Sequence, residues 1–79
     1  MARVLLFGRL SDLAGWRERE LESATISALR AQLSSQDAVL GEALAGPGVQ
    51  VALDQAIVRG DAALTPRSEV AFLPPMSGG

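Results

Sequence analysis

The chain has 79 residues, 48% of them hydrophobic, and a formal net charge of −2 at neutral pH. A chain this short makes one small domain, which buries only about 60% of the surface exposed on unfolding, and its apolar share excludes a disordered chain. Because it contains no histidine, cysteine or tyrosine, it lacks the usual nucleophiles, general bases and soft metal ligands, so we expect no catalysis by the chain alone and no metal site.

The first quarter of the sequence predicts a strand, a short helix and a charged strand. Residues 3 to 8 form an apolar run that ends at a glycine, which is typical of a buried first strand. Residues 9 to 15 carry apolar side chains at helical spacing before a glycine, and Trp16 is expected to cover the edge of the core. Arginine and glutamate alternate over residues 17 to 20, and Leu21 and Glu22 follow. This charge over residues 17 to 22 favours a solvated strand at the edge of a sheet.

The main helix is predicted to begin after Thr25. The hydroxyl of this residue can cap the helix, and Ile26, Leu29 and Leu33 follow at the spacing of a core-facing stripe. Arg30 falls outside that stripe, so we expect its side chain to be directed outward.

The second half of the sequence predicts a further short helix followed by strands. Asp37 can cap the helix, which ends at the Gly46-Pro47-Gly48 breaker. Residues 49 to 53 alternate in the pattern of a half-buried strand, and residues 55 to 58 predict another short strand before a turn at residues 59 to 61. A loop and a final strand over residues 69 to 73 complete the pattern.

Pairing of the first and last strands would produce a sheet with two different faces, because alternate residues point in opposite directions. The set directed toward the main helix is Val4, Leu6, Val70 and Phe72. The opposite set is Leu5, Phe7, Ala71 and Leu73. One helix shields one face, so the second set is expected to form an open apolar patch of the kind that marks a partner surface. The alternative is that the second helix or the loops cover Phe7 and Leu73.

The last six residues predict a tail that works inside another protein. We expect a single domain over residues 1 to 79, with residues 74 to 79 a flexible tail reaching at most about 20 Å. Its base is stiffened by two prolines, and its two glycines lack a Cβ and fit a narrow channel. The threading residues are Pro74, Pro75, Met76, Ser77 and Gly78. The Gly79 carboxylate is the expected reacting group, and it must be activated because an ionised carboxylate resists nucleophiles.

Charge and hydropathy also limit the partners. The seven basic residues are all arginines and are scattered, so they form no basic stripe for nucleic acid. No run approaches the roughly 18 apolar residues of a membrane span, and the start does not resemble a signal peptide. We therefore expect no membrane partner and a cytoplasmic location. Without lysine the chain cannot accept an isopeptide bond on a side chain.

Both ends of the sequence resemble one family, the small subunit of molybdopterin synthase. Residues 4 to 10 and 13 to 15 are similar to its opening, and residues 69 to 79 to its close. Asp54-Gln55 departs from the usual Asn-Gln, and Arg67-Ser68 replaces a common Gly-Asp. The resemblance implies an α+β fold of the β-grasp (ubiquitin-like) type, with a mixed sheet of four to five strands packed on one main helix and additional short helices.

The resemblance also implies a function as a sulfur carrier in molybdenum cofactor biosynthesis. An activating enzyme would use ATP to adenylate Gly79, and an external sulfur donor would convert it to a thiocarboxylate. The large catalytic subunit, in a heterotetramer, would receive the tail, and the sulfur would pass to a cyclic pterin precursor. The carrier would hold no permanent cofactor. Phe7, Ile57 and Leu73 match apolar positions at which the family contacts its partners.

Three alternatives remain. The sulfur carrier of thiamine biosynthesis shares the fold, tail and chemistry, although length and the two prolines favour molybdopterin. A ubiquitin-like modifier joined to target lysines would use the same activated end. A plain interaction domain is the third, and the agreement of the patch, the prolines and the glycines disfavours it.

Overall fold

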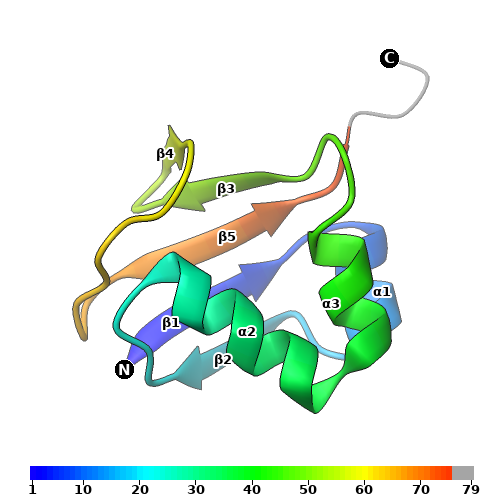
Figure 1. The fold of residues 1–79 in the computed structure, drawn as a ribbon, viewed down its shortest axis with the longest axis horizontal. Helices are drawn as coiled ribbons and strands as arrows, with labels where there is room; N and C mark the ends of the chain where they lie inside the picture. Colours follow the sequence, from blue (N-terminus) through cyan, green and yellow to red (C-terminus); the bar gives the residue numbers. More distant parts are fainter. Residues whose placement is uncertain (76–79) are drawn as a thin grey trace.

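The computed structural model describes residues 1–75, which form a five-stranded mixed sheet and three helices (Figure 1). In chain order the elements are β1 (Ala2–Leu6), α1 (Arg9–Ala14), β2 (Glu18–Leu21), α2 (Ile26–Gln36), α3 (Ala38–Leu44), β3 (Gln50–Leu53), β4 (Ala56–Val58) and β5 (Glu69–Leu73). The strands lie in the order β2-β1-β5-β3-β4, with β1 and β5 parallel and the other neighbours antiparallel. The predicted β-grasp architecture, with one main helix and shorter ones, is confirmed.

Two side-chain caps start the two longer helices. The Thr25 hydroxyl accepts a hydrogen bond from the Ala28 N–H at 3.0 Å, and the Asp37 carboxylate accepts one from the Leu40 N–H at 3.1 Å. The Asp37 N–H also donates to the Leu33 carbonyl, so this residue ends α2 as it begins α3. Both predicted caps are confirmed, and each satisfies a backbone donor that a helix start leaves without a partner.

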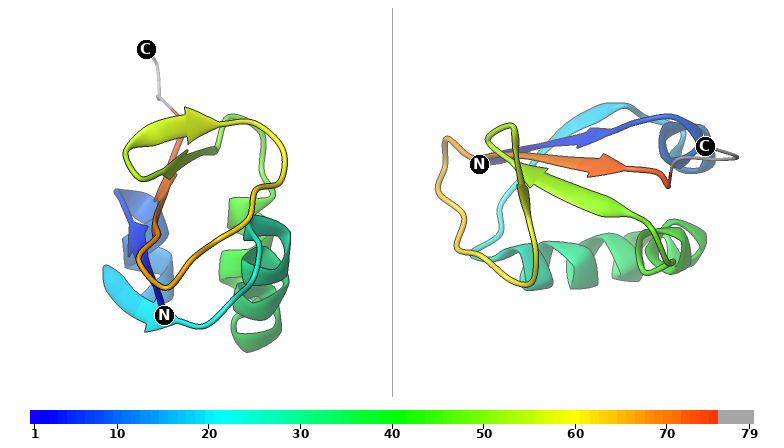
Figure 2. Two further views of the ribbon diagram at one scale, coloured as in Figure 1. Left: turned by 90° about the vertical axis from the view of Figure 1, so that its left-hand side faces the viewer. Right: turned by 90° about the horizontal axis from the view of Figure 1, so that it is seen from above.

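The core lies between one face of the sheet and the helices α2 and α3, as Figure 2 shows. Its buried members are Val4, Leu6, Leu10, Ile26, Leu29, Leu33, Leu40, Leu44, Val51, Val70 and Phe72. In the parallel pair of β1 and β5, Val4 lies opposite Val70 and Leu6 opposite Phe72, which confirms the set predicted to face the main helix. Trp16 is half-buried at the edge of this core, also as predicted.

No helix within residues 1–75 covers the opposite face of the sheet (Figure 2). The short helix α1 lies at one end of the sheet and contacts α3. Nor is any helix in this part of the chain both long and apolar enough to cross a membrane. The uncovered face is the one on which sequence parity placed the apolar patch.

The turn between β3 and β4 differs from the prediction at one residue. Gln55, expected to begin the strand, instead lies with Asp54 in a two-residue turn in which both have positive φ, 72° and 50°. The Asp54 carboxylate accepts a hydrogen bond from the Glu69 N–H at 2.9 Å, and the Asp54 N–H donates to the Glu69 carbonyl at 2.8 Å. These two bonds attach the turn to the start of β5.

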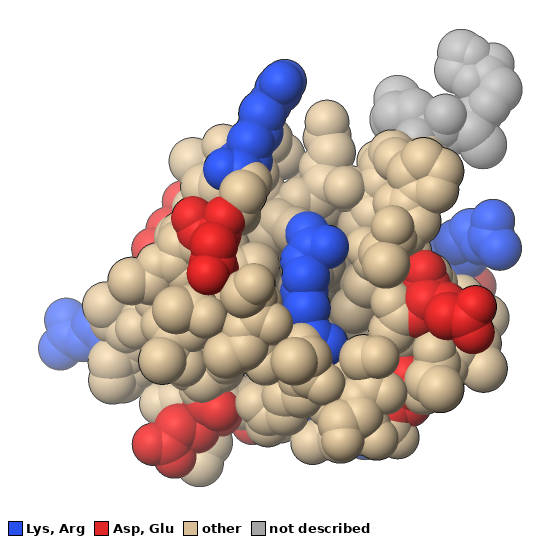
Figure 3. All heavy atoms as spheres, viewed as in Figure 1, with Lys and Arg blue, Asp and Glu red and all other residues tan. Residues whose placement is uncertain are grey.

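Charged side chains are dispersed over the helix-side face of the molecule. Figure 3 shows arginines and acidic residues standing apart there, with neutral surface between them. On this face the arginines therefore form no continuous basic stripe of the kind that binds phosphate backbones.

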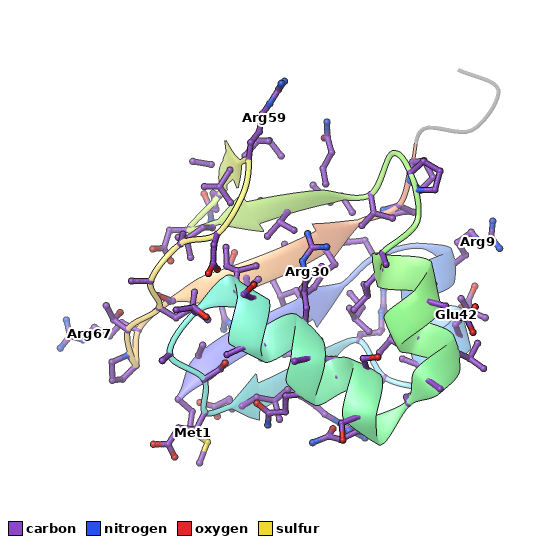
Figure 4. The ribbon with its side chains drawn as sticks, in the orientation of Figure 1. Met1, Arg9, Arg30, Glu42, Arg59 and Arg67 are labelled. Carbon is purple, nitrogen blue, oxygen red and sulfur yellow. The ribbon has the colours of Figure 1, made fainter. Side chains whose placement is uncertain are left out.

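Arg30 does not point outward as predicted. Its side chain is half-buried and rises from α2 across the core edge (Figure 4), and its guanidinium carbon lies 5.8 Å from the centroid of the Phe72 ring. One guanidinium nitrogen lies 3.5 Å from the Leu44 carbonyl oxygen at the C-terminal end of α3. The expectation was wrong because a long arginine side chain can lay its apolar stem over the core while its charge reaches a helix end.

Candidate functional site

The uncovered face of the sheet carries a row of apolar residues across four strands. Leu5 lies opposite Ala71, Ala71 opposite Ala52, and Ala52 opposite Ile57, so all four point to this face. The two central members are alanines, and larger side chains flank them on both sides. The row therefore has buried small residues at its centre and larger apolar side chains at its two ends.

Two of the three predicted contact residues present large apolar surface. Phe7 is 45% exposed and Ile57 is 50% exposed, whereas Leu73 is less exposed and half-buried. The patch predicted beside the tail is therefore open at Phe7, and neighbouring residues cover part of Leu73. Phe7 and Ile57 lie on opposite sides of β5, three strand spacings apart and two residues out of register, so a partner that touches both must span more than about 14 Å.

A groove of about 330 Å³ lies beside Phe7. It is lined by Leu5, Leu6, Phe7, Gly8, Ser11, Arg17 and Glu18. It joins the apolar patch to the charged edge strand β2, which the sequence predicted for residues 17 to 22. A side chain of a partner can enter the recess at the end of the sheet where β1 stops.

The other end of the same face is charged. Arg3 donates a hydrogen bond to the Glu69 carboxylate at 2.8 Å and lies 3.8 Å from the Glu18 carboxylate. The hydrogen bond to Glu69, followed by the charge of Glu18, raises the pKa of Arg3 above its ordinary value. The uncovered face is thus divided, with an apolar half beside the exit of β5 and an ion-paired half at the start of β1.

The base of the tail leaves the sheet at the apolar end. The Phe7 N–H donates to the Phe72 carbonyl at 3.3 Å, which extends the β1–β5 pairing one residue beyond the end of β1. Pro74 and Pro75 follow, and because proline has no N–H they cannot continue the pairing. Figure 1 shows the chain leaving beside the loop that joins α3 to β3. Of the predicted tail, Met76, Ser77, Gly78 and Gly79 lie outside the described residues.

Two glycines that the sequence marked only as breakers contact the tail base. A Cβ placed on Gly8 would lie 3.0 Å from Pro74 Cγ, and one on Gly48 would lie 2.7 Å from Pro75 Cβ. The first contact could have been found from the sequence, because continuing the parallel register beyond Leu6 and Phe72 brings Gly8 opposite Pro74. The second required the position of β3.

The uncovered face combines apolar side chains with a few charged and polar ones. Its side chains are apolar in the row from Leu5 to Ile57 and charged around Arg3, and Ser11 and Arg17 line the groove. In the described part of the chain no three acidic side chains gather to hold a metal ion. The structure thus brings Phe7, Leu73 and the two prolines to one end, with Ile57 at the far edge of the same face.

Comparison with known proteins gives consistent matches over the whole chain. The model of the ThiS family matches residues 4–79. A protein of Escherichia coli (strain K12) named "Molybdopterin synthase sulfur carrier subunit" is 35% identical over 81 residues, and the match covers 100% of both chains.

Two solved structures share the fold. The crystal structure of SAMP1 from Haloferax volcanii has a TM-score of 0.86 at 23% identity and covers 99% of this chain and 98% of its own. The solution structure of the small archaeal modifier protein 1 from Methanosarcina acetivorans has a TM-score of 0.87 at 20% identity and covers 99% and 95%. At these identities the likeness concerns the fold alone.

Proposed function

Because the chain belongs to the ThiS family, we propose that it is a sulfur carrier of molybdenum cofactor biosynthesis that works through the Gly79 carboxylate. The observation that carries this proposal is the 35% identity, over the full length of both chains, to a relative named as a molybdopterin synthase sulfur carrier subunit. The family resemblance drawn from the two ends of the sequence is confirmed by the same matches.

The proposed reaction has two loading steps. The Gly79 carboxylate attacks the α-phosphate of ATP on an activating enzyme, which forms an acyl adenylate and releases pyrophosphate. Hydrosulfide released by a sulfur donor then attacks the acyl carbon and displaces AMP, which leaves a thiocarboxylate at Gly79. ATP is consumed by the enzyme, and the carrier holds no permanent cofactor. Because the chain has no cysteine, the sulfur comes from outside.

The thiocarboxylate then serves as the nucleophile of a second enzyme. In the proposed complex, a heterotetramer with the large catalytic subunit of molybdopterin synthase, residues Pro74 to Gly78 thread the tail into the active site. The sulfur passes to a cyclic pterin precursor and the carrier returns for reloading. The carrier itself contributes no catalytic side chain, and we place the reaction in the cytoplasm.

The uncovered face supports the proposal as a docking surface. Phe7 and Ile57 expose apolar area on the face whose apolar end lies beside Pro74, so one partner can cover the patch and receive the tail together. We propose Phe7, Ile57 and Leu73 as the contact residues. Apolar residues of this kind dominate the energy of protein interfaces when a partner buries them.

Intact-mass measurement tests the loading reaction. Incubation with a cognate activating enzyme, ATP and a sulfur donor should raise the mass by about 16 Da, the difference between sulfur and oxygen in a thiocarboxylate, whose thiolate character makes it the nucleophile. A variant with one alanine added after Gly79 is the matched control and should gain no mass. Equal loading of both forms would contradict a role for the Gly79 carboxylate.

The product to which the loaded carrier transfers its sulfur distinguishes the proposed pathway from its alternatives. The ThiS match alone does not separate molybdenum cofactor synthesis from thiamine synthesis, whereas the name of the Escherichia coli relative favours the former. Formation of molybdopterin from the cyclic pterin by the loaded carrier and the large subunit is the expected result. Conjugates to lysine side chains that survive reductant would instead indicate a modifier.

A further inference from the structure

The strand β5 lies between β1 and β3, and a glycine beyond each neighbour contacts the chain that leaves β5. Gly8 lies two residues after the end of β1, and Gly48 lies two residues before the start of β3. Gly8 contacts the ring of Pro74, and Gly48 contacts Pro75. The two prolines are therefore flanked by glycines from the two strands next to β5, at the point where main-chain pairing stops.

Neither glycine can be exchanged for a larger residue without moving its proline. The Cβ of an alanine at position 48 would lie 2.7 Å from Pro75 Cβ, whereas carbon atoms in good contact are about 3.5 to 4.0 Å apart. Pro75 Cβ is part of a rigid ring, so the proline would have to shift by roughly 1 Å. At Gly8 the corresponding distance is 3.0 Å to Pro74 Cγ, and the required shift is smaller.

Turn geometry alone does not explain these contacts. Gly8 and Gly48 have positive φ, 56° and 84°, but so do Gly15 at 82° and Gly60 at 83°. A Cβ at Gly15 or at Gly60 would meet no atom within 4 Å. All four glycines have positive φ, although Gly8 with ψ −134° lies outside the αL region that Gly15 occupies. Gly8 and Gly48 add close contact with the tail base.

We propose that Gly8 and Gly48 form a glycine seat that sets the direction in which the tail leaves the sheet. They are positioning residues, since they act on the tail through the two prolines and not on the reacting carboxylate. The consequence for sulfur loading rests on the function proposed above. A tail whose base is held in one direction beside the apolar patch loses less conformational entropy when it enters the active site of a docked partner. A displacement of about 1 Å at this base can lower the reaction rate by up to about 100-fold.

Four alanine variants test the seat, with the open glycines as matched controls. Gly48→Ala and Gly8→Ala strain the backbone and displace a proline, whereas Gly60→Ala and Gly15→Ala strain the backbone only. With cognate activating enzyme, ATP and sulfur donor, kcat/KM for thiocarboxylation should be at least about tenfold lower for Gly48→Ala than for Gly60→Ala. Gly8→Ala should show a smaller loss than Gly48→Ala, and Pro74→Ala should relieve it, because Gly15 lies in the αL region and does not match the backbone strain at Gly8. Equal values for Gly48→Ala and Gly60→Ala, with the wild type loaded normally, would overturn the proposal.

A second readout does not depend on activity. The carbon-13 chemical shifts of the Pro75 ring should change in Gly48→Ala and those of the Pro74 ring in Gly8→Ala, while both stay unchanged in the two control variants. Unchanged proline shifts would refute the seat even if loading fails for every form. Should the wild type fail to load with its cognate enzyme while the shifts change as expected, the proposed function is wrong and the seat stands.

Removing the proline atom that the new alanine would meet should restore the direction of the tail. Pro75→Gly deletes the Cβ that an alanine at position 48 would meet, so Gly48→Ala should cost at least about threefold less in the Pro75→Gly background than in the wild type. The same cost in both backgrounds would mean that Gly48 does not act through Pro75. If Gly48→Ala does not fold, as judged by circular dichroism, the milder Gly8→Ala with its Pro74→Ala partner provides the same cycle.

Discussion

Two phenylalanines at the same end of the β1–β5 pair show how differently the two faces of the sheet are used. Phe72 points toward α2 and is completely buried, whereas Phe7, whose N–H donates to the Phe72 carbonyl, remains 45% exposed on the apolar half of the other face. They are neighbours along the pairing but face different surroundings. The comparison suggests that one strand pair divides its side chains between stabilising the fold and meeting a partner.

The largest expected effect is on the buried phenylalanine. Phe72→Ala should lower the free energy of unfolding by about 3 to 5 kcal/mol, because it removes contacts throughout the core and leaves a cavity. Phe7→Ala should cost less than about 1 kcal/mol, since much of that ring is already in water. Urea unfolding at 25 °C measures both. Similar losses for the two variants would show that Phe7 also stabilises the core.

The affinity for a partner, in contrast to stability, should depend more on Phe7 than on Phe72. Phe7→Ala should weaken the proposed complex with the large subunit by tenfold or more, because an aromatic hot-spot residue is worth about 2 kcal/mol or more at an interface. Leu13→Ala is the matched control, since Leu13 is a 41% exposed apolar residue on α1, outside the strands of the open face. Isothermal titration of the purified partners gives the affinities. Equal weakening by both substitutions would mean that general surface hydrophobicity drives association.

Sequence patterns predicted the division between the faces because strand parity depends only on alternation. Once β1 and β5 were placed side by side, the positions of Val4, Leu6, Val70 and Phe72 followed. The caps at Thr25 and Asp37 were also predictable, since a side-chain oxygen three residues before a helical N–H is a local signal. These features need no knowledge of distant contacts.

Features that depend on distant residues were not predictable in the same way. Ser68 is buried although serine usually lies at the surface, because its hydroxyl accepts a hydrogen bond from the Thr65 N–H and completes the turn before β5. The contact of Gly48 with Pro75 requires the crossing from α3 to β3. The tail residues that the sequence marked most strongly lie outside the described residues, so their roles stay predictions.

The smallest expected effect is that of replacing Arg30, the charged residue that covers Phe72 on the helix side of the sheet. Arg30 lies over the ring of Phe72, with its guanidinium carbon 5.8 Å from the ring centroid. Arg30→Met keeps an apolar stem and removes the charge, so it should lower the free energy of unfolding by about 0.5 to 1 kcal/mol through loss of the cation–π contact. Arg30→Ala should lose somewhat more, because the stem is removed as well.

The pair of Arg30 variants separates charge from packing on the helix-side face. If Arg30→Met is as stable as the wild type while Arg30→Ala is not, the stem alone covers Phe72 and the guanidinium contributes nothing to stability. Neither variant should change affinity for the proposed large-subunit partner, because Arg30 lies on the face opposite the apolar row from Leu5 to Ile57. A loss of affinity in Arg30→Met would place a partner on the helix side and would break the division of labour between the two faces of the sheet.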